Sequence, residues 1–421
     1  PPRTRAIVPS DIPAPRTARR ARAAMLAGLL LALPAAGAGP AAQEQGIFFA
    51  GGCDEGERLR IAAVGDLLFH GHLQKQALAH EDGFAAFWKP VEHVLRSADI
   101  AYANLEGPAA RNVMAGGRDR GGKVDGSARV YDRAVYAGGE DDVLVFNFHP
   151  SAVADAKAGG FTVLSTANNH SADRGSLGIE RTIEALEAAG MPFTGTRTRA
   201  ARDEGRPWRS VTRARGFSVA WIACTFSLNG LPDRERLVLG CYARDGAPAE
   251  EVLAEIRAAA AEPGVDAVVL APHWGAEYQH QPAAQERRLA REAVLAGATA
   301  VIGAHPHVLQ PWEKVVAPDG REGLVAYSLG NFISAQFGTP RRSAAIALLE
   351  LSRGPDGAAR LSAAGYVPTW VAFGRPYRVL ENTGADGKES REGLDLALRI
   401  LPKANHMRAD ELATLPRRCP G

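Results

Sequence analysis

The chain has 421 residues, of which 49 are lysine or arginine and 47 are aspartate or glutamate, for a formal net charge of +2. Because basic and acidic residues are interleaved along the chain, the composition argues against a strongly basic surface of the kind that binds nucleic acids. The length is sufficient to bury a large core, as one large domain or two.

The first fifty residues are predicted to direct export. An apolar stretch at 23–36 follows four closely spaced arginines, and Ala36-Gly37-Ala38 provides small residues for cleavage. A basic segment, a short apolar run and a small-residue exit are typical of a secretory signal peptide. The run is short for a membrane span, although an uncleaved anchor remains the alternative. We therefore expect a mature chain that begins near Gly39, in the periplasm or outside the cell.

Four cysteines are present, at Cys53, Cys224, Cys241 and Cys419. An even number of cysteines in an exported protein favours disulfides, and the absence of a C-x-x-C pair argues against a zinc–thiolate site. We favour Cys224–Cys241, which closes a local loop, together with Cys53–Cys419, which ties the two ends of the chain. Buried free thiols are the alternative.

Apolar runs predict strands, and apolar residues at helical spacing predict helices, over most of the remaining chain. The predicted strands lie at 59–64, 99–103, 161–165, 208–212, 217–224, 266–271, 300–302, 313–316, 324–328, 344–351 and 361–369. The predicted helices lie at 84–97, 151–158, 177–189, 248–261 and 283–296, and a polar helical tail ends the chain. Strand and helix alternate in the first half, which is typical of a doubly wound α/β arrangement.

A long segment at 111–142, rich in Gly, Arg and Asp, is predicted to be a loop with a short hairpin at 128–136. A loop of this length is usually functional or mobile. Its basic residues would either line a groove for an anionic polymer or lie solvated on a mobile loop. They are Arg111, Arg118, Arg120, Lys123, Arg129 and Arg133.

Polar side chains follow the predicted strands at the points where the strands end. Six of the 11 histidines lie in such positions, at His70, His72, His170, His273, His305 and His307. Asp66, Glu106 and Asn169 occupy equivalent places after the first three strands. Open α/β sheets bind ligands at the carboxyl ends of their strands, so these residues predict a shared site. The alternatives are that Asp66 caps the next helix and that the paired histidines are solvated loop residues.

The chemistry of these side chains indicates the kind of site. Asp, Glu, Asn and His without cysteine suit divalent Mn, Fe or Zn. Ligands contributed by several strands suit two ions that activate water and clamp a phosphate-like centre. Asp173, three residues after His170, would orient that imidazole through its other ring nitrogen.

Six motifs occur in the order of a known family. They are Gly65-Asp66, Asn104-Leu105-Glu106-Gly107, Asn168-Asn169-His170, His273-Trp274-Gly275-x-Glu277-Tyr278, Gly303-Ala304-His305-Pro306-His307-Val308-x-Gln310 and Ser328-Leu329-Gly330-Asn331-Phe332. From about residue 58 to 337 the chain resembles the CapA family, named for poly-gamma-glutamate capsule synthesis, which is similar to the calcineurin-like metallophosphoesterases. The resemblance implies a four-layer α/β/β/α sandwich over 58–375, with a C-terminal extension at 376–421.

The resemblance also implies roles for individual residues. The metal ligands would be Asp66, Glu106, Asn169, His273, His305 and His307. His170 would be the catalytic histidine that acts on the leaving group, with Asp173 beside it. Two departures stand out: Leu68 occupies the place of a histidine ligand, which His70 or His72 would have to replace, and Glu106 stands where the superfamily has Asp.

Two functions follow from these expectations. The first is an exported, divalent-metal-dependent hydrolase that acts on a phosphoester or on a polyglutamate-like polymer of the cell envelope during capsule synthesis. The second is a non-enzymatic factor for binding or exporting the capsule polymer on the same fold. The expected partners are an anionic or peptide-like envelope polymer and other capsule-synthesis proteins, with a membrane contacted only through an uncleaved leader.

Overall fold

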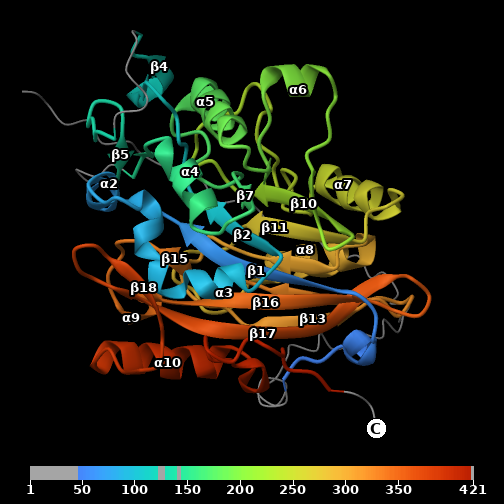
Figure 1. Ribbon diagram of the computed structural model, residues 1–421. Helices are drawn as coiled ribbons and strands as arrows, with labels where there is room; N and C mark the ends of the chain where they lie inside the picture. The colour runs from blue at the N-terminus through green and yellow to red at the C-terminus, as the bar shows by residue number, and fades with distance from the viewer. Residues whose placement is uncertain (1–45, 122–128, 140–143, 419–421) are drawn as a thin grey trace, which may run out of the picture. The chain divides into compact units, whose positions relative to one another are not determined.

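Two β-sheets lie face to face, and each is covered on its outer side by helices (Figure 1). The structure is a computed structural model that describes residues 46–121, 129–139 and 144–418. The predicted signal segment and its cleavage site lie outside the described residues, as does Cys419.

The first sheet has strand order β18-β17-β16-β1-β2-β7-β8, and β15 pairs with the end of β1. Strands β1, β2, β7, β8 and β15 run parallel, whereas β16 to β18 form an antiparallel edge. The bounds are β1 Arg58–Leu67, β2 Ile100–Leu105, β7 Val163–Ser165, β8 Phe193–Thr194, β15 Asn331–Ile333, β16 Ser343–Arg353, β17 Ala359–Ala372 and β18 Arg378–Glu381.

The second sheet has strand order β13-β14-β12-β11-β10-β9. Its four central strands are parallel, and each of its two edges is closed by an antiparallel pair. The bounds are β9 Ser210–Ala214, β10 Phe217–Thr225, β11 Ala267–His273, β12 Ala300–Ile302, β13 Trp312–Val316 and β14 Glu322–Ala326.

The helices complete the outer layers. On the first sheet lie α2 Gly71–Leu78, α3 Glu92–Arg96, α4 Ser151–Ala158 and α5 Gly175–Ala188, and on the second lie α7 Glu250–Ala261 and α8 Ala284–Ala296. The remaining helices are α6 Arg199–Asp203, α9 Thr339–Arg342 and α10 Lys388–Ile400, with 3-10 turns η1 Ala50–Cys53, η2 Gly83–Phe87, η3 Lys89–Val91, η4 Ala115–Gly117 and η5 Lys403–Asn405. The predicted α/β class and the four-layer α/β/β/α order are confirmed.

Side-chain alternation along the strands explains the layers. On β1, Ile61 faces the space between the sheets, whereas the next residue, Ala62, faces the helices, as the two-residue period of a strand requires. Between the sheets, the Tyr102 ring stacks on Trp221 of the second sheet with centroids 5.2 Å apart. The inter-sheet core therefore fixes the two sheets against each other.

One predicted helix is broken. The segment 84–97 forms η2, η3 and only a short α3 instead of a continuous helix. Pro90 lies in the middle of this segment, where it removes a backbone donor and disfavours helical geometry at the preceding residue. The apolar spacing survives the interruption, because Phe84, Phe87 and Val94 all remain in the core.

The predicted hairpin at 128–136 is also wrong where the structure describes it. Residues 129–136 contain no strand. Instead β3 Val113–Met114 pairs with β4 Arg118–Asp119 around two glycines with positive φ, and β5 Ala137–Gly138 pairs with β6 Phe146–Asn147. Glycine adopts this left-handed conformation readily, so the turn at 115–117 determines where the hairpin forms.

The ends of the described chain pack into the same fold. Strand β18 extends the first sheet, and α10, at the bottom of the view in Figure 1, packs on β16 and β17. The side chain of Asn405 accepts the N–H of Ile47 at 2.7 Å and donates to its carbonyl at 2.9 Å. Among the described residues, no helix is long and apolar enough to cross a membrane.

The disulfide predicted between Cys224 and Cys241 is confirmed. It joins the end of β10 to the segment that returns beside this strand, where Thr225 bridges Gly240. The second predicted pair, Cys53–Cys419, includes a residue outside the described chain and stays a prediction.

Candidate metal centre

Five of the six predicted metal ligands come together where strands of the two sheets end. Three overlapping groups of side chains have ligand atoms within 4.8 Å of one another, and each group can hold a metal ion. The groups are Glu106 with His273 and His305, Asp66 with Glu106 and His307, and Glu277 with His305 and His307. The first sheet thus contributes the acids Asp66 and Glu106, and the second sheet contributes the three histidines.

Asp66 lies near the end of β1, where the strand passes very close to a turn. A Cβ on the preceding Gly65 would lie 1.9 Å from the carbonyl oxygen of Gly330, so only glycine allows this approach. Asp66 is fully buried, and its Oδ1 accepts a hydrogen bond from Asn104 at 2.8 Å. Its Oδ2 lies 3.2 Å from Nδ1 of His307. The carboxylate is therefore fixed toward the histidines.

The carboxylate of Glu106 is the most unusual group in the cluster. The side chain is 0% exposed, and neither oxygen has a hydrogen-bond partner. Its Oε1 lies 3.5 Å from Nε2 of His273 and 3.7 Å from Nε2 of His307. Burial, followed by the charge of Asp66, raises the pKa of Glu106 well above its usual range. A buried carboxylate without a partner is costly, and a cation between Glu106 and these imidazoles would satisfy it.

Two histidines of the second sheet, His273 and His305, are held in the neutral form. Burial and the neighbouring imidazoles lower the pKa of His273 well below its ordinary value, and burial lowers the pKa of His305 to about 3. Neutral imidazole is the form that binds metals. Together with two carboxylates and no thiolate, these side chains fit a borderline or hard divalent ion.

Backbone strain is concentrated in the same place. His305 and His307 have φ values of 97° and 58°, and Tyr278 has a φ of 64°. Residues other than glycine adopt such angles rarely and at an energetic cost. The strained turn after β12 directs both histidines of the H-x-H pair into one cluster, with ring centroids 5.8 Å apart.

The sixth predicted ligand lies beside the cluster. Asn169, which follows β7, places its Oδ1 2.9 Å from Nε2 of His273, and that nitrogen also lies 3.1 Å from Nδ1 of His305. Asn169 is thus bonded to a candidate ligand, while its own role as a ligand stays a prediction.

His170 and Asp173 form the predicted pair. Nδ1 of His170 lies 2.8 Å from Oδ2 of Asp173, and the same oxygen accepts the N–H of Phe146 at 2.7 Å. The ring of Phe146 packs against the imidazole with centroids 4.6 Å apart. These contacts fix the orientation of the His170 ring, and they leave its Nε2 without a hydrogen bond to another described residue.

Two histidines left open by the sequence do not enter the three groups. His70 is close to the centre, but its Nδ1 lies 3.3 Å from the N–H of Ala335, and burial lowers its pKa to about 4. His72 is exposed and packs on Tyr377 with centroids 5.3 Å apart. Leu68 is buried, and no described histidine takes its place among the three groups.

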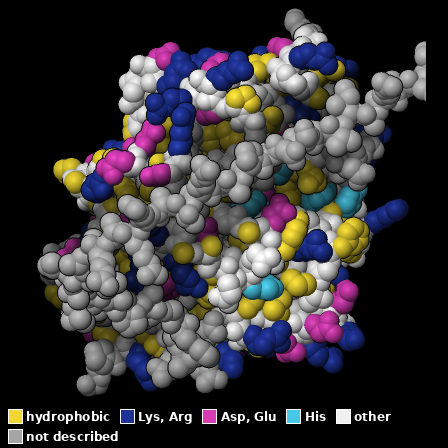
Figure 2. Space-filling view, turned by 180° about the vertical axis from the view of Figure 1, so that it is seen from behind, with side chains coloured by type: hydrophobic (Ala, Val, Ile, Leu, Met, Phe, Trp, Pro, Cys, Tyr) yellow, Lys and Arg dark blue, Asp and Glu magenta, His cyan; other side chains and the backbone are white. Residues whose placement is uncertain are grey.

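Two site residues were not singled out from the sequence. Glu277 belongs to one of the three groups, and Asn331 lies with its Oδ1 2.9 Å from Nδ1 of His307. Both stand in motifs that carry the CapA resemblance, which was the signal for finding them. On the face shown in Figure 2, histidine side chains gather beside acidic ones.

The basic residues of the 111–142 segment contribute little to this site. Arg120 pairs with Asp132 and Arg129 pairs with Asp155, so two of the predicted groove residues are already neutralised. Lys123 lies outside the described residues.

Comparisons with known proteins agree on one family. The model of the family described as "Bacterial capsule synthesis protein PGA_cap" matches residues 60–336. The chain is 27% identical to "Capsule biosynthesis protein CapA" of Bacillus anthracis, over 69% of this chain and 64% of that protein. It is 26% identical to "PGA biosynthesis protein CapA" of Bacillus subtilis, over 71% and 69%. The match therefore spans slightly less than two thirds of the Bacillus anthracis protein.

Solved structures give a more distant likeness. NAD nucleotidase (NadN) of Haemophilus influenzae superposes with a TM-score of 0.44 at 12% identity, covering 84% of this chain and 57% of that one.

Proposed function

The chain belongs to the bacterial capsule synthesis protein PGA_cap family, and from that premise we propose that it is a divalent-metal-dependent hydrolase of the cell envelope. Its substrate would be a phosphoester or a polyglutamate-like polymer handled during capsule synthesis. The observation that carries the proposal is the carboxylate of Glu106, which is buried without a hydrogen-bond partner next to the imidazoles of His273, His305 and His307.

The residues that would hold the metal come from both sheets. Asp66 and Glu106 supply carboxylate oxygen, and His273, His305 and His307 supply imidazole nitrogen, with Asn169 and Glu277 at the margins. By the CapA resemblance, two ions of Mn, Fe or Zn would be bound. A divalent ion in such a cluster supplies Lewis acidity and makes water a nucleophile at neutral pH.

His170 would move the proton in this reaction. Because Asp173 accepts from Nδ1, the free Nε2 would carry the proton to a leaving oxygen or nitrogen. General acid catalysis of this kind is worth about 10²–10⁴ in rate. Asn104 and Asn331 would orient Asp66 and His307 through the hydrogen bonds described above, as partners behind metal ligands commonly do.

The test is a hydrolase panel run on the purified chain. The protein is stripped with a chelator, reloaded separately with Mn, Fe or Zn, and assayed against phosphoesters and against amide-linked polyglutamate. The proposal expects turnover that disappears with the chelator and returns with one of the metals. If no metal-dependent hydrolysis is found while the polymer still binds, the non-enzymatic polymer factor replaces the hydrolase.

Export is part of the same proposal. The Cys224–Cys241 disulfide is consistent with an oxidising compartment, and the capsule lies outside the cell. Mass spectrometry of the protein from its native host should find a chain that begins near Gly39. A retained apolar segment at 23–36 would contradict cleavage and would favour an anchored form.

A further inference from the structure

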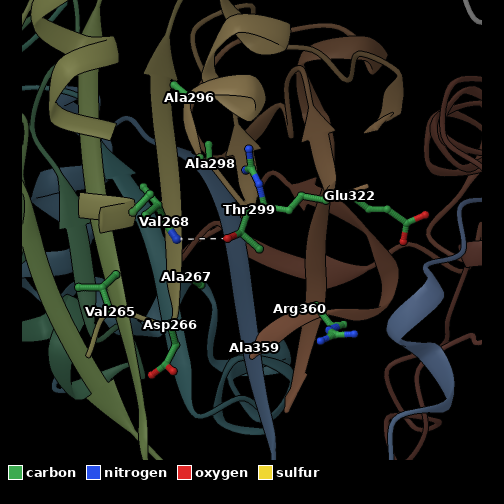
Figure 3. A pocket seen from close by; sticks show the side chains of 13 residues that line it. Val265, Asp266, Ala267, Val268, Ala296, Ala298, Thr299, Glu322, Ala359 and Arg360 are labelled. Carbon is green, nitrogen blue, oxygen red and sulfur yellow. Dashed lines mark hydrogen bonds between the residues drawn. The ribbon is translucent and has the colours of Figure 1, made fainter. Parts of the chain in front are cut away.

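The cavity in Figure 3 holds no unmet charge. It has a volume of about 290 Å³ and lies where β11 and β12 begin, at the opposite end of these strands from the candidate metal centre. All its charged residues have ion-pair partners: Asp266 pairs with Arg353, Arg321 with Asp319, Glu322 with Lys314 and Arg360 with Asp356. A charged ligand would therefore have to break an existing pair to bind there.

Arg341, beside the candidate metal centre, is a charge without such a partner. No acid of the described chain forms an ion pair with it, and its half-buried guanidinium lies over the ring of Tyr278, 4.8 Å from the centroid. The next residue shows the contrast, because Nη1 of Arg342 lies 2.6 Å from Glu389 and its guanidinium lies 4.0 Å from the centre of the Trp370 ring. Arg341 therefore keeps donors that a ligand can use.

The backbone of Arg341 is tied to the candidate ligand His307. Nδ2 of Asn331 donates to the carbonyl of Arg341 at 3.0 Å, and Oδ1 of the same side chain lies 2.9 Å from Nδ1 of His307. Asn331 is fully buried at the start of β15, which pairs with β1 at Asp66. One buried side chain thus joins the metal centre to the short helix α9 that carries Arg341.

Tyr278 places the guanidinium of Arg341 beside the same ligand. The ring centroid of Tyr278 lies 6.1 Å from that of His307, and its backbone N–H donates to the carbonyl of Pro306 at 2.8 Å. Burial, followed by the neighbouring Glu277, raises the pKa of Tyr278 to about 12, whereas the nearby Arg341 opposes this rise. Glu277 in turn lies 4.0 Å from Nε2 of His307. Arg341, Tyr278 and Glu277 therefore share one edge of the metal centre.

A cation in this position is unfavourable for a metal centre by itself. Like charges repel, so the guanidinium opposes the binding of divalent ions in the cluster beside it. The acids of the cluster do not neutralise it, because Asp66, Glu106 and Glu277 are grouped with the imidazoles instead. An anionic substrate oxygen at the metal centre would reverse this balance, since a guanidinium binds carboxylate or phosphate oxygens through two parallel hydrogen bonds.

We infer that Arg341, held in place by Tyr278, binds an anionic oxygen of the substrate at the metal centre. The inference rests on the proposed function and adds to it a substrate-contacting residue that is neither a metal ligand nor part of the His170–Asp173 pair. The oxygen belongs to a phosphate or to a carboxylate, both of which match the planar fork of arginine. Tyr278 is the positioning residue, because its ring supports the face of the guanidinium.

The test measures metal and anion binding separately in the full chain. The wild-type chain, Arg341→Gln, Arg341→Lys and Tyr278→Phe are loaded with Mn or Zn, freed of excess ion and analysed for elements per chain. Isothermal titration calorimetry then gives their affinities for inorganic phosphate and for acetate. Arg378→Gln is the matched control, because Arg378 is an exposed arginine of β18 that has no ion pair in the described chain and belongs to none of the three metal groups.

Arg341→Gln should weaken binding of the anion by about 10- to 100-fold, as expected for the loss of hydrogen bonds to a charged group. Arg341→Lys should restore part of the affinity, because it keeps the charge and loses the planar fork. Tyr278→Phe should weaken binding less than Arg341→Gln, and Arg378→Gln should leave it unchanged. All four variants should hold the wild-type number of ions and unfold at the wild-type temperature. Without an anion, the metal affinity of Arg341→Gln should equal or exceed that of the wild-type chain.

The two anions identify the group that carries the oxygen. A loss confined to phosphate assigns a phosphate group, a loss confined to acetate assigns a carboxylate, and equal losses assign a site for either. Three results would overturn the inference: neither anion binds the metal-loaded wild-type chain, Arg341→Gln binds both anions as well as Arg378→Gln does, or Arg341→Gln loses its metal. The last result would give Arg341 a purely structural role.

Turnover separates this inference from the proposed function. Anion binding that depends on Arg341 without hydrolysis of any panel substrate would remove the hydrolase and keep the inference. Hydrolysis that Arg341→Gln leaves unchanged would keep the hydrolase and remove the inference. A wild-type chain that takes up no divalent ion would overturn both, and the elemental analysis identifies that case before any anion is added.

Discussion

Glu106 sets the protonation behaviour of the metal centre. Burial, followed by the charge of Asp66, raises its pKa well above the usual range, which favours the protonated form in the metal-free chain. The pKa of His273 and that of His305 are lowered, so these two rings are already free of the extra proton. A divalent ion that binds here therefore competes with a proton for the carboxylate of Glu106.

We predict that metal affinity rises with pH by up to about tenfold per unit below the raised pKa of Glu106, since one bound proton is exchanged. Calorimetric titration of Mn or Zn in buffers of different ionisation enthalpy should report close to one proton released per cluster. In Glu106→Gln this release should vanish and affinity should fall. Binding heats that do not depend on the buffer would show that metal binding releases no proton from Glu106.

His170 separates proton transfer from metal binding. Its ring is fixed by Asp173 and it belongs to none of the three groups found among the described residues. His170→Ala should keep the bound metal and lower turnover by about 10²–10⁴. His305→Ala is the control, which should lose metal as well as activity. Turnover of His170→Ala at the wild-type rate would end its proposed role.

Sequence patterns at the residue scale located most of the cluster. Asp66, Glu106, His273, His305 and His307 were all expected at strand ends, and parallel strands deliver such residues to one edge of a sheet. Glu277 was not foreseen as a ligand because it lies four residues beyond β11, where positive φ angles at Gly275 and Tyr278 turn the chain back toward the histidines. Such turns depend on tertiary contacts that local patterns do not encode.

At the scale of secondary-structure elements, one strand formed as its sequence predicted and one predicted helix did not. Strand β12 was expected at its observed bounds, because a short apolar run ended by glycine has few alternatives. The helix expected at 84–97 was interrupted at Pro90. The apolar spacing predicted correctly which side chains of this segment are buried. It did not predict the backbone conformation, because Pro90 prevents a continuous helix.

The Cys224–Cys241 disulfide joins the end of β10 to the segment that returns beside it. Its cysteines are 17 residues apart, and a loop of this length corresponds to about 3 kcal/mol of unfolded-state entropy in the chain-entropy account. We predict that Cys224→Ala with Cys241→Ala lowers the free energy of unfolding by about 2–4 kcal/mol. Denaturant titration with and without reductant measures this, and an unchanged midpoint would contradict it.

For the whole molecule, the candidate metal centre bridges the two sheets. The first sheet supplies Asp66 and Glu106 and the second supplies the histidines, so a bound ion would add to the inter-sheet packing of Tyr102 on Trp221. The four-layer order was expected only through the CapA resemblance. Periodicity gave the strands and helices, but it contains no information on which strands share a sheet.

Metal removal should therefore destabilise the folded chain. A ligand present at 100 times its dissociation constant stabilises the native state by about 2.7 kcal/mol. We predict that a chelator lowers the unfolding temperature of the wild-type chain and leaves that of His305→Ala nearly unchanged. Differential scanning calorimetry checks both, and an equal decrease in the two proteins would indicate that the chelator acts elsewhere.

Metal content tests the central claim most directly. The full chain is incubated in turn with Mn, Fe and Zn, freed of excess ion, and analysed for elements per chain alongside His305→Ala and Glu106→Gln. We predict close to two divalent ions in the wild-type chain and a clear loss in both variants. A folded wild-type chain that retains no stoichiometric ion from any of the three would contradict the metal centre and the hydrolase built on it.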